Sequence, residues 1–304
     1  MEDRKAIIIG ISGCSSSGKT TLARLLRDIF PNTFILHEDD FYKSDDQIPI
    51  KDGIADWDCA EALSLPDMEA ALAHIRTAGT FPVSTLRSPS LSHRRDHGRP
   101  PPPTVDDDSL PSPPPPHPLT SPRPQPTVNS KEDLNSVGAL PISDAQVAAS
   151  KARVAAWLAP GQPGSRIFSS PSAPRICLLD GFLLYSPPAF STVMASLDVK
   201  LFLLVSREKA THRREARDGY VTLDGFWQDP PGYVEKIVWP NYAAAHAWMF
   251  EGGDAEKGVL DQRALEREGI HAQVGKGMDV EFGETLGWAV ETIMGELERL
   301  VLGR

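Results

Sequence analysis

Short apolar runs recur along this chain and are separated by segments with a different periodicity. Two such runs, residues 6–11 and 33–37, lie near the start, and two more span 176–180 and 199–205. Continuous apolar runs of this length are typical of strands that are buried on both faces of a sheet. A further strand is predicted at 270–274.

Helical periodicity follows the first run. Between residues 21 and 30 the apolar positions 22, 25, 26, 29 and 30 form one stripe of an amphipathic helix. Further helices are predicted at 66–76, 144–158, 207–218, 232–250 and 284–300, the fourth interrupted near Pro240. Strands that alternate with helices predict an α/β fold, in which a parallel sheet is flanked by helices on both faces.

One segment breaks this alternation. Half of the 28 prolines fall between Pro89 and Pro126. Because proline is excluded from helix interiors and central strands, we expect residues 88–130 to form a disordered or polyproline-II insertion in a single domain that spans 1–304. The helix predicted at 144–158 is assigned to this insertion. The proline runs could bind an SH3 or WW domain, although a solvated insertion without a partner is the favoured interpretation.

Composition narrows the class of protein. The chain has 304 residues, a formal net charge of −10 and a pI near 5.3, which argues against a nucleic-acid-binding surface. No apolar run approaches the length of a membrane helix, and no signal-peptide pattern precedes the first strand. Cys14, Cys59 and Cys177 fit no metal or disulfide spacing. We therefore expect a soluble protein of the cytoplasm, with the nucleus as an alternative, that binds neither nucleic acid nor membranes.

The turn between the first strand and the first helix carries the strongest chemical signal. Its sequence fits G-x-x-x-x-G-K-[ST], the phosphate-binding loop, in the strand–loop–helix context that this loop requires. Backbone N–H groups and the helix N-terminus would surround the phosphates. Lys19 would reach the β- and γ-phosphates, and the Thr20 hydroxyl would ligate Mg²⁺. The predicted ATP-binding residues here are Gly13, Cys14, Ser15, Ser16, Ser17, Gly18, Lys19, Thr20 and Thr21.

Carboxylates follow two of the predicted strands. Asp180 closes the third run, where a Walker-B carboxylate would lie, and Asp39 and Asp40 follow the second. In open α/β sheets ligands bind outside the carboxyl ends of the strands, which places these groups beside the phosphate loop. There a carboxylate can accept the proton of an attacking hydroxyl or hold Mg²⁺. A solvated turn is the alternative for the Asp39–Asp40 pair.

Two further segments are ambiguous on sequence alone. Trp57 and Asp58 could be a core aromatic and a helix N-cap, or a stacking ring and an acceptor for both ribose hydroxyls. The basic cluster at 211–217 could be a solvated helix face or a set of phosphate ligands. It opens a glycine- and proline-punctuated region, 207–231, that we interpret as a lid closing over the site.

These motifs together resemble the nicotinamide riboside kinases and, more widely, the uridine kinase and phosphoribulokinase group of P-loop kinases. The similarity covers about residues 5–76 and 174–250. Its most selective part is the acidic turn with an aromatic-Asp pair about eighteen residues further on. The matching segments are Ile9 to Gly13, Gly18 to Leu22, Asp39-Asp40-Phe41-Tyr42-Lys43, Trp57-Asp58, Asp180 to Leu184 and Val238-Trp239-Pro240-x-Tyr242.

The resemblance implies a role for each matching position. Asp39 would accept the proton of the ribose 5′-hydroxyl and lie next to Mg²⁺ beside Thr20. Asp58 would hold the ribose diol, and Trp57 would stack on the nicotinamide ring. The remaining implied residues are Asp40, Phe41 and Tyr42 on the substrate, Arg213 and Arg217 on the ATP phosphates, Arg214 on the substrate side, and Asp229 at the carboxamide end.

Three features depart from the family pattern. Trp57 replaces a more usual tyrosine, and the proline-rich insertion has no counterpart in the short members. The lid is longer than in the animal enzymes, which leaves open whether Tyr220 or Trp227 forms the second aromatic wall.

The charge of the substrate fits such a site. Nicotinamide riboside carries a pyridinium cation, and aromatic faces and carboxylates favour binding of a cation, by about 0.5–2 kcal/mol for one ring contact.

The expected activity is therefore transfer of the γ-phosphoryl group of MgATP to the 5′-hydroxyl of nicotinamide riboside, giving nicotinamide mononucleotide; acceptance of nicotinic acid riboside is left open. A uridine/cytidine kinase, or a kinase of another small alcohol, is the nearest alternative. A GTPase-type switch is disfavoured because the chain has no Asn-Lys-x-Asp tetrapeptide. A scaffold that acts through the proline runs is the third class.

Overall fold

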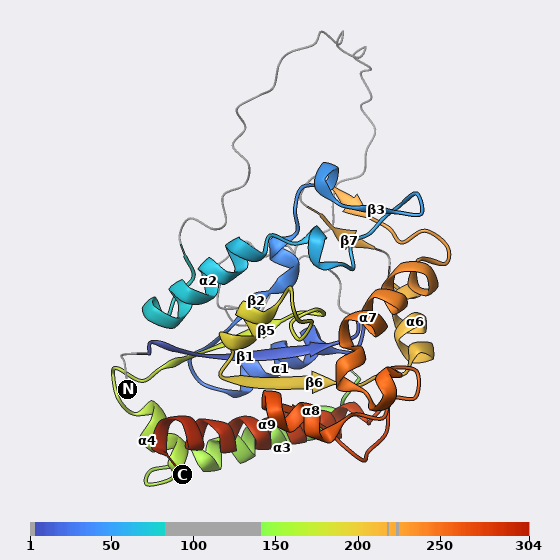
Figure 1. The fold of residues 1–304 in the computed structure, drawn as a ribbon. Coiled ribbons are helices and arrows are strands. Elements are labelled where there is room, and N and C mark those ends of the chain that lie inside the picture. The colour runs from blue at the N-terminus through green and yellow to red at the C-terminus, as the bar shows by residue number, and fades with distance from the viewer. Residues whose placement is uncertain (1–3, 83–140, 218, 223–224, 304) are drawn as a thin grey trace, which may run out of the picture.

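A parallel sheet of five strands, in the order β2-β5-β1-β6-β9, forms the centre of the molecule (Figure 1). The computed structural model describes residues 4–82, 141–217, 219–222 and 225–303. The strands are β1 (Ala6–Gly13), β2 (Thr33–His37), β5 (Arg175–Asp180), β6 (Val199–Leu203) and β9 (Ile270–Ala272). All five predicted strands are confirmed, the last two with earlier ends than the apolar pattern indicated.

The central strand β1 shows why its sequence is apolar from Ala6 to Ile11. Ile7, Ile9 and Ile11 belong to the hydrophobic cluster on one face of the sheet, and Ala6 and Ile8 belong to the cluster on the other. Parallel neighbours, β5 and β6, pair with both edges of β1. A strand covered on both faces and both edges has no position where a polar side chain meets water.

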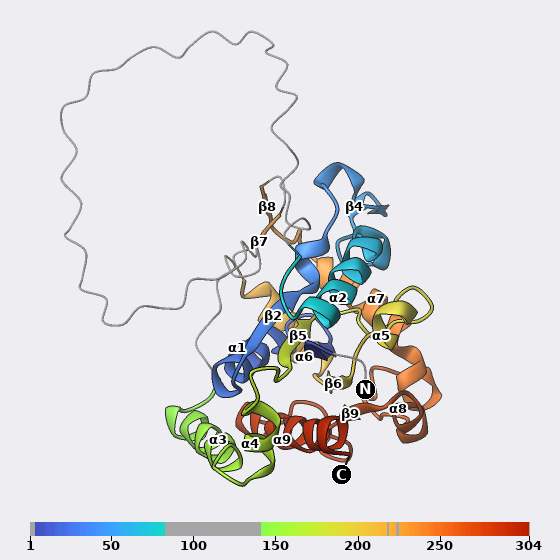
Figure 2. The ribbon, with the colours of Figure 1, turned by 90° about the vertical axis from the view of Figure 1, so that its left-hand side faces the viewer.

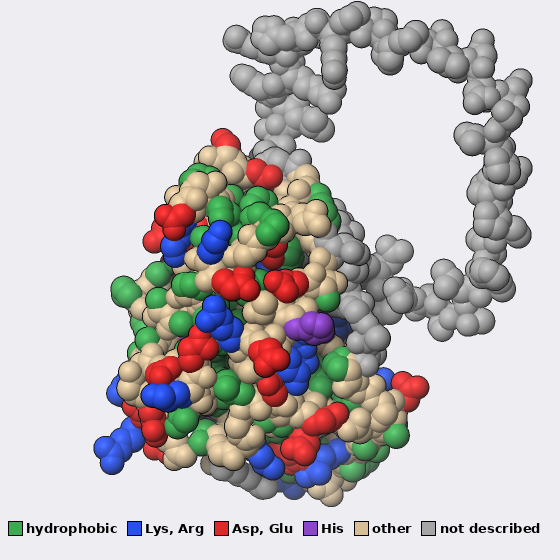
Figure 3. Space-filling view, turned by 90° about the vertical axis from the view of Figure 1, so that its right-hand side faces the viewer, with side chains coloured by type: hydrophobic (Ala, Val, Ile, Leu, Met, Phe, Trp, Pro, Cys, Tyr) green, Lys and Arg blue, Asp and Glu red, His purple; other side chains and the backbone are tan. Residues whose placement is uncertain are grey.

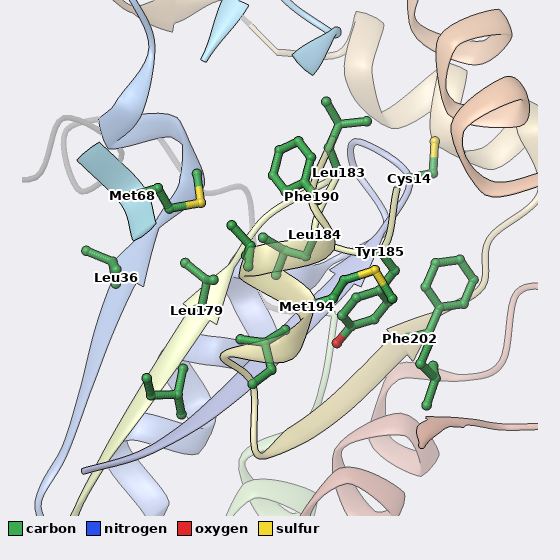
Figure 4. Close-up of a cluster of buried hydrophobic side chains, with 14 of the residues drawn as sticks. Cys14, Leu36, Met68, Leu179, Leu183, Leu184, Tyr185, Phe190, Met194 and Phe202 are labelled. Atoms are coloured by element: carbon green, nitrogen blue, oxygen red, sulfur yellow. The ribbon is translucent and has the colours of Figure 1, made fainter. Parts of the chain in front are cut away.

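One face of the sheet is covered by helices α2 (Leu65–Ala78), α5 (Ser191–Ala195), α7 (Trp239–His246) and α8 (Gln262–Glu268). Figure 4 shows part of this core, where Met68 of α2 and Leu179 of β5 point into the same interior. The wholly buried Tyr185 donates its hydroxyl proton toward the carbonyl oxygens of Gly10, at 2.8 Å, and Leu201, at 3.1 Å. This polar anchor ties the segment after β5 to the two central strands.

The opposite face is covered by α1 (Lys19–Ile29), α3 (Asp144–Trp157), α4 (Pro163–Phe168) and α9 (Phe282–Leu297), the last extended by a π-helical turn, Glu298–Leu302. Figures 1 and 2 show α3, α4 and α9 side by side along this face.

The assignment of the 144–158 helix to the insertion is wrong. Helix α3 is part of this layer: Val154 and Trp157 are buried in its core, and the Trp157 indole donates to Glu298 Oε1 at 2.7 Å. Its N-terminus is fixed by a capping box between Ser143 and Gln146. The alanine-rich sequence gave a weak amphipathic signal, because few large residues are needed to bury a helix against a neighbouring helix.

The predicted interruption near Pro240 takes the form of a π-helix. The segment Val234–Val238 is π-helical and leads directly into α7, where Pro240 lies in the first turn. Proline has no N–H to donate to the preceding turn, and the wider π-turn before Pro240 accommodates the missing donor. The helix therefore continues with a changed register instead of ending. Helix α6 (Arg207–Glu215) is shorter than predicted, and the last helix begins two residues earlier.

Two small hairpins lie together beside the sheet (Figure 1). They are β3 (Ile50–Lys51) with β4 (Ile54–Ala55), and β7 (Tyr220–Val221) with β8 (Phe226–Trp227). Short 3₁₀ turns complete the structure: Glu38–Phe41, Asp45–Gln47, Ala60–Ala62, Ala247–Met249 and Glu251–Gly253.

The predicted insertion at 88–130 lies outside the described residues, so its disorder and its SH3 or WW contact stay predictions. Within the described ranges, no helix is both long and apolar enough to span a bilayer.

Candidate active site

The phosphate loop joins β1 to α1, which confirms the predicted strand–loop–helix context. Gly13 has φ +146°, and a Cβ at this position would collide with the carbonyl oxygen of Leu203. Gly18 is left-handed, with φ +100°, and is the N-cap of α1. The two glycines of the motif are therefore required by backbone geometry.

Lys19 lies folded over this loop. Its ammonium group donates to the Cys14 carbonyl at 2.9 Å, and its side chain is buried. Burial raises the pKa of the Cys14 thiol to about 12, so this cysteine is protonated and inert at neutral pH. Among the described residues, the hydroxyls of Ser16 and Ser17 are buried without a hydrogen-bond partner. Orphan donors in a phosphate loop are suited to anionic oxygens.

Asp180 ends β5 where the Walker-B carboxylate was predicted, and it is paired with His37. The two residues are register partners at the ends of adjacent strands, with His37 Nδ1 3.2 Å from Asp180 Oδ2. Burial alone would raise the pKa of Asp180, but the hydrogen bond and charge of His37, together with Lys19 and the Thr20 hydroxyl, outweigh it and hold this pKa below its usual range. Asp180 is therefore ionised beside the phosphate loop.

The acidic turn Glu38–Phe41 follows β2 directly. Asp39 and Asp40 line the same pocket as Lys19 and Thr20, so the structure brings these predicted residues together. Phe41 does not face them: its side chain is buried in the core cluster and is absent from the pocket lining.

Glu38 was not singled out by its sequence, yet it fixes this turn. Its side chain is wholly buried and accepts from the Leu183 N–H at 3.2 and 3.3 Å. A Cβ at Gly181 would collide with the Glu38 carboxyl group. Burial and the neighbouring Asp39 charge raise the pKa of Glu38 well above its usual range. The turn that carries Asp39 is thus tied to the end of β5 through a glycine that leaves room for the contact.

A buried arginine connects three parts of the pocket. Arg214 of α6 binds both carboxylate oxygens of Asp58, at 2.8 and 3.0 Å, and both of Asp229, at 2.6 and 3.2 Å. It also donates to Ser15 Oγ at 2.8 Å. Burial raises the pKa of Asp58, and the Arg214 charge and hydrogen bonds partly offset this rise. The proposed lid, the wall that carries Asp58 and the phosphate loop therefore share one guanidinium.

The aromatic residues divide into two groups. Trp57 contacts Tyr42, with ring centroids 5.3 Å apart, and Trp227 at 5.9 Å, while Trp227 also contacts Tyr233 at 5.8 Å. Tyr220 instead lies under the guanidinium groups of Arg214 and Arg217, at 5.1 and 5.3 Å from its ring centre. Of the two aromatic residues of the proposed lid, Trp227 contacts Trp57 and Tyr220 contacts the arginines.

The two ambiguous interpretations of Trp57 and Asp58 have different outcomes. Asp58 is not a helix cap, because the next turn begins after Cys59 and has no side-chain cap. Trp57 is 6 % exposed and packs with Ile48 and Ala62, yet it also lines the pocket. It is therefore a core aromatic that presents part of its surface to the site.

The two remaining predicted arginines contact the phosphate loop and Tyr220. Arg213 donates to the Ser16 carbonyl at 3.3 Å, and Arg217 donates to the Tyr220 hydroxyl at 3.3 Å. Arg217 lines the pocket beside Tyr220. On the surface reached from the strand ends, acidic and basic side chains are interspersed (Figure 3).

Sequence similarity now decides the family. The chain matches no protein-family model. It is 31 % identical over 299 residues to the nicotinamide riboside kinase of Schizosaccharomyces pombe, covering 97 % of this chain and 99 % of that protein. This chain belongs to the nicotinamide riboside kinase family. It is also 28 % identical to the Saccharomyces cerevisiae nicotinamide riboside kinase, over 97 % of this chain and 98 % of that one. Human nicotinamide riboside kinase 2 is 28 % identical over 78 % of this chain and 66 % of its own length.

Several residues that line the pocket of this riboside kinase family member, or hold its wall in place, were not predicted from the sequence. His37 could have been found, because it ends a strand as Asp180 does. Tyr233, Asp56 and Asn241 could not, because each acts by contacting a segment more than 170 residues away along the chain. Asn241 occupies the unspecified position, written x, of the Val238-Trp239-Pro240-x-Tyr242 motif.

Proposed function

We propose that this protein transfers the γ-phosphoryl group of ATP to the 5′-hydroxyl of nicotinamide riboside and produces nicotinamide mononucleotide. The observation that carries the proposal is one continuous pocket with two chemically different ends. One end is lined by Lys19 and Thr20, and the other by Trp57, Asp58 and Trp227. The names of the family relatives in fungi and mammals support the same substrate.

At the phosphate end, the chain supplies cations and N–H donors. Lys19 and the loop backbone would neutralise the β- and γ-phosphates, together with Arg213 of α6 and Arg217, which follows that helix. Phosphoryl transfer requires little covalent chemistry from the protein, so these charges and their positions provide most of the rate acceleration.

The residues at this end also fit Mg²⁺. Thr20, Asp39 and Asp180 present hard oxygen atoms to one pocket. Mg²⁺ usually takes only one or two protein ligands and fills its other positions with phosphate oxygens and water. When bound, Mg²⁺ would offset the negative charge of the phosphate oxygens during transfer. Thr20 and Asp39 are the residues that would hold it.

Asp39 is the proposed general base. Because Asp39 lines the same pocket as Lys19, it would accept the proton of the 5′-hydroxyl as that oxygen attacks the γ-phosphorus. Asp40 and Tyr42 line the wall next to it.

The riboside would occupy the opposite end. Asp58 offers the remaining lone pairs of its carboxylate to the ribose diol, and Arg214, whose N–H groups are taken up by Asp58, Asp229 and Ser15, holds that carboxylate in place on the substrate side. Trp57 and Trp227 present aromatic surface to the pyridinium ring, whose charge suits the aromatic faces and the acidic lining. Asp229 would lie at the carboxamide end, fixed by the Trp227 indole at 2.8 Å.

A substrate panel tests the proposal. Purified protein with MgATP is assayed against nicotinamide riboside, nicotinic acid riboside, uridine, cytidine and pantothenate. We expect the highest kcat/KM for nicotinamide riboside, because only the pyridinium ribosides gain the cation–aromatic contact. A kcat/KM for uridine or cytidine above that for nicotinamide riboside would contradict the proposal and favour a pyrimidine nucleoside kinase.

A further inference from the structure

The segment that carries Trp57 and Asp58 has no regular secondary structure of its own. It lies between β4 and the turn Ala60–Ala62. Without a ladder or a helix, its shape depends on contacts made by side chains from elsewhere. The contacts come from the helical segment that includes Tyr233 and α7.

Asn241 of α7 makes the largest number of these contacts. Its Nδ2 donates to both carboxylate oxygens of Asp56, each at 2.9 Å, and to the backbone carbonyl of Asp58 at 3.2 Å. Its Oδ1 accepts from Lys51 Nζ at 2.8 Å. One amide therefore reaches both sides of Trp57.

The charges around Asn241 fix the orientation of its amide. The reversed amide would place an oxygen against the Asp56 carboxylate and an NH₂ group against the Lys51 ammonium. Both contacts would be repulsive, so only one orientation satisfies the site.

The amide also completes the partners of a buried carboxylate. Asp56 is 4 % exposed and accepts the Asp58 N–H at 3.0 Å in addition to the Asn241 bonds. The Trp57 N–H is held separately, by the Tyr233 hydroxyl at 3.0 Å. Trp57 and Asp58 are thus fixed through their backbone atoms, which leaves the indole face and the Asp58 carboxylate directed to the pocket and to Arg214.

Within α7, Asn241 differs in burial from its neighbours and is therefore available for a polar contact. Its neighbours Trp239 and Tyr242 are 3 % and 5 % exposed and pack into the core, whereas Asn241 lies half-buried toward the Asp56 segment. The Val238-to-Tyr242 motif therefore has one core face and one polar contact that points at the proposed riboside wall.

We propose that Asn241 is a positioning residue for the riboside, acting through the Asp56–Asp58 segment rather than by touching the substrate. This inference rests on the proposed function, since it assigns the riboside to the Trp57–Asp58 wall. Removing the amide should disturb riboside binding and leave the phosphate loop, which Asn241 does not contact, unchanged.

The test compares Asn241→Ala with wild type in the full-length protein. We expect the KM for nicotinamide riboside to rise about tenfold, because small displacements of a binding wall weaken every contact it makes. The KM for ATP should change less than twofold, and the kcat at saturating riboside should stay within about threefold. A general loss of folded protein would instead lower kcat and leave both KM values unchanged.

Two companion variants complete the test. Ala244→Ser alters an exposed position of the same helix and should leave all three constants as in wild type. Asn241→Ser keeps one donor, which cannot serve Asp56 and Asp58 together, and should raise the riboside KM about threefold. It replaces the alanine variant if the latter shows no cooperative melting transition.

The outcomes separate the two claims. If wild type phosphorylates nicotinamide riboside and a folded Asn241 variant keeps the wild-type riboside KM, the positioning role is overturned and the proposed function stands. A parallel rise in the KM for ATP also overturns it. If wild type does not phosphorylate nicotinamide riboside, both fail.

Discussion

The two ends of the pocket are built in different ways. The phosphate end consists mainly of one continuous stretch, residues 13–20, shaped by two left-handed glycines and a helix N-terminus. The proposed riboside end is assembled from Trp57 and Asp58, from Arg214 and from the proposed lid around Trp227. Its central contact, between Asp58 and Arg214, joins residues 156 positions apart.

The difference shows which part of the pocket a short sequence motif can specify and which part requires tertiary packing. A phosphate loop needs backbone N–H groups in a fixed turn, and a short sequence can specify that turn by itself. A wall for a riboside needs side chains placed several ångströms apart around a ring, which no single turn provides. The first end can be recognised from a motif, whereas the second depends on the packing of α6 and α7 against the sheet.

The largest effect is expected at the phosphate end. Lys19→Ala removes the cation proposed to face the β- and γ-phosphates and should lower kcat by about 10³–10⁵-fold, the range known for an arginine that stabilises the same kind of transition state. Steady-state kinetics with a thermal melt checks that the fold persists. Turnover near the wild-type rate would remove this end of the pocket from the mechanism.

Asp39→Asn tests the proposed general base. It keeps the size of the side chain but removes its basicity, so kcat should fall by about 10²–10⁴-fold while the KM for the riboside changes little. If the loss is partly recovered at high Mg²⁺ concentration, Asp39 acts mainly on the metal. Normal turnover at saturating substrate would shift the base to Asp40 or Asp180.

A buried histidine of α7 is expected to make the unfolding free energy depend on pH. His246 of α7 is wholly buried, and burial lowers its pKa from 6.5 to about 4. Between these values the unfolded chain binds a proton that the folded protein excludes, so the unfolding free energy should rise with pH across this window and level off above pH 7. The contribution is about 3 kcal/mol.

Urea denaturation from pH 4.5 to 8 measures this slope. His246→Phe removes the titrating group, and the difference between wild type and variant isolates it from the carboxylates, including Asp180, that also lose stability in acid. Equal slopes for the two proteins would show that His246 does not resist protonation in the folded state.

The two lid aromatics sharpen the comparison between the ends. Trp227→Ala should raise the KM for nicotinamide riboside about tenfold and spare the KM for ATP, because Trp227 faces Trp57. Tyr220→Ala should act more on ATP, since Tyr220 lies against Arg214 and Arg217. Measuring both KM values in both variants decides the assignment, and the reverse pattern would exchange the two roles.

The smallest effect is expected for the proline-rich segment. Deleting residues 88–130 and joining the ends by a short glycine-serine linker should leave both KM values and kcat unchanged, since the proline-rich composition predicts a segment that builds no core. The entropy of closing a long loop changes little, by ~0.6 kcal/mol for each doubling of its length. A collapsed melting transition in the deletion variant would contradict this expectation.

The sequence by itself determined the sheet, the phosphate loop and the identity of most pocket residues. Strands buried on both faces form near-continuous apolar runs, and the loop needs glycines at two positive φ angles. Both features can therefore be recognised in a short stretch of sequence. The same holds for Asp180, whose place at a strand end follows from the apolar run before it. Helix α3 marks the limit of this information, because its alanine-rich face does not reveal which surface it covers.

Tertiary structure alone decided how the riboside end is held together. The bidentate contacts of Arg214, the separation of Trp227 from Tyr220, and the four bonds of Asn241 join segments that are distant along the chain. A hydrogen bond between distant side chains leaves no periodicity in either partner's sequence. Its geometry exists only once the helices have packed, since directional bonds depend on positions that the whole core sets.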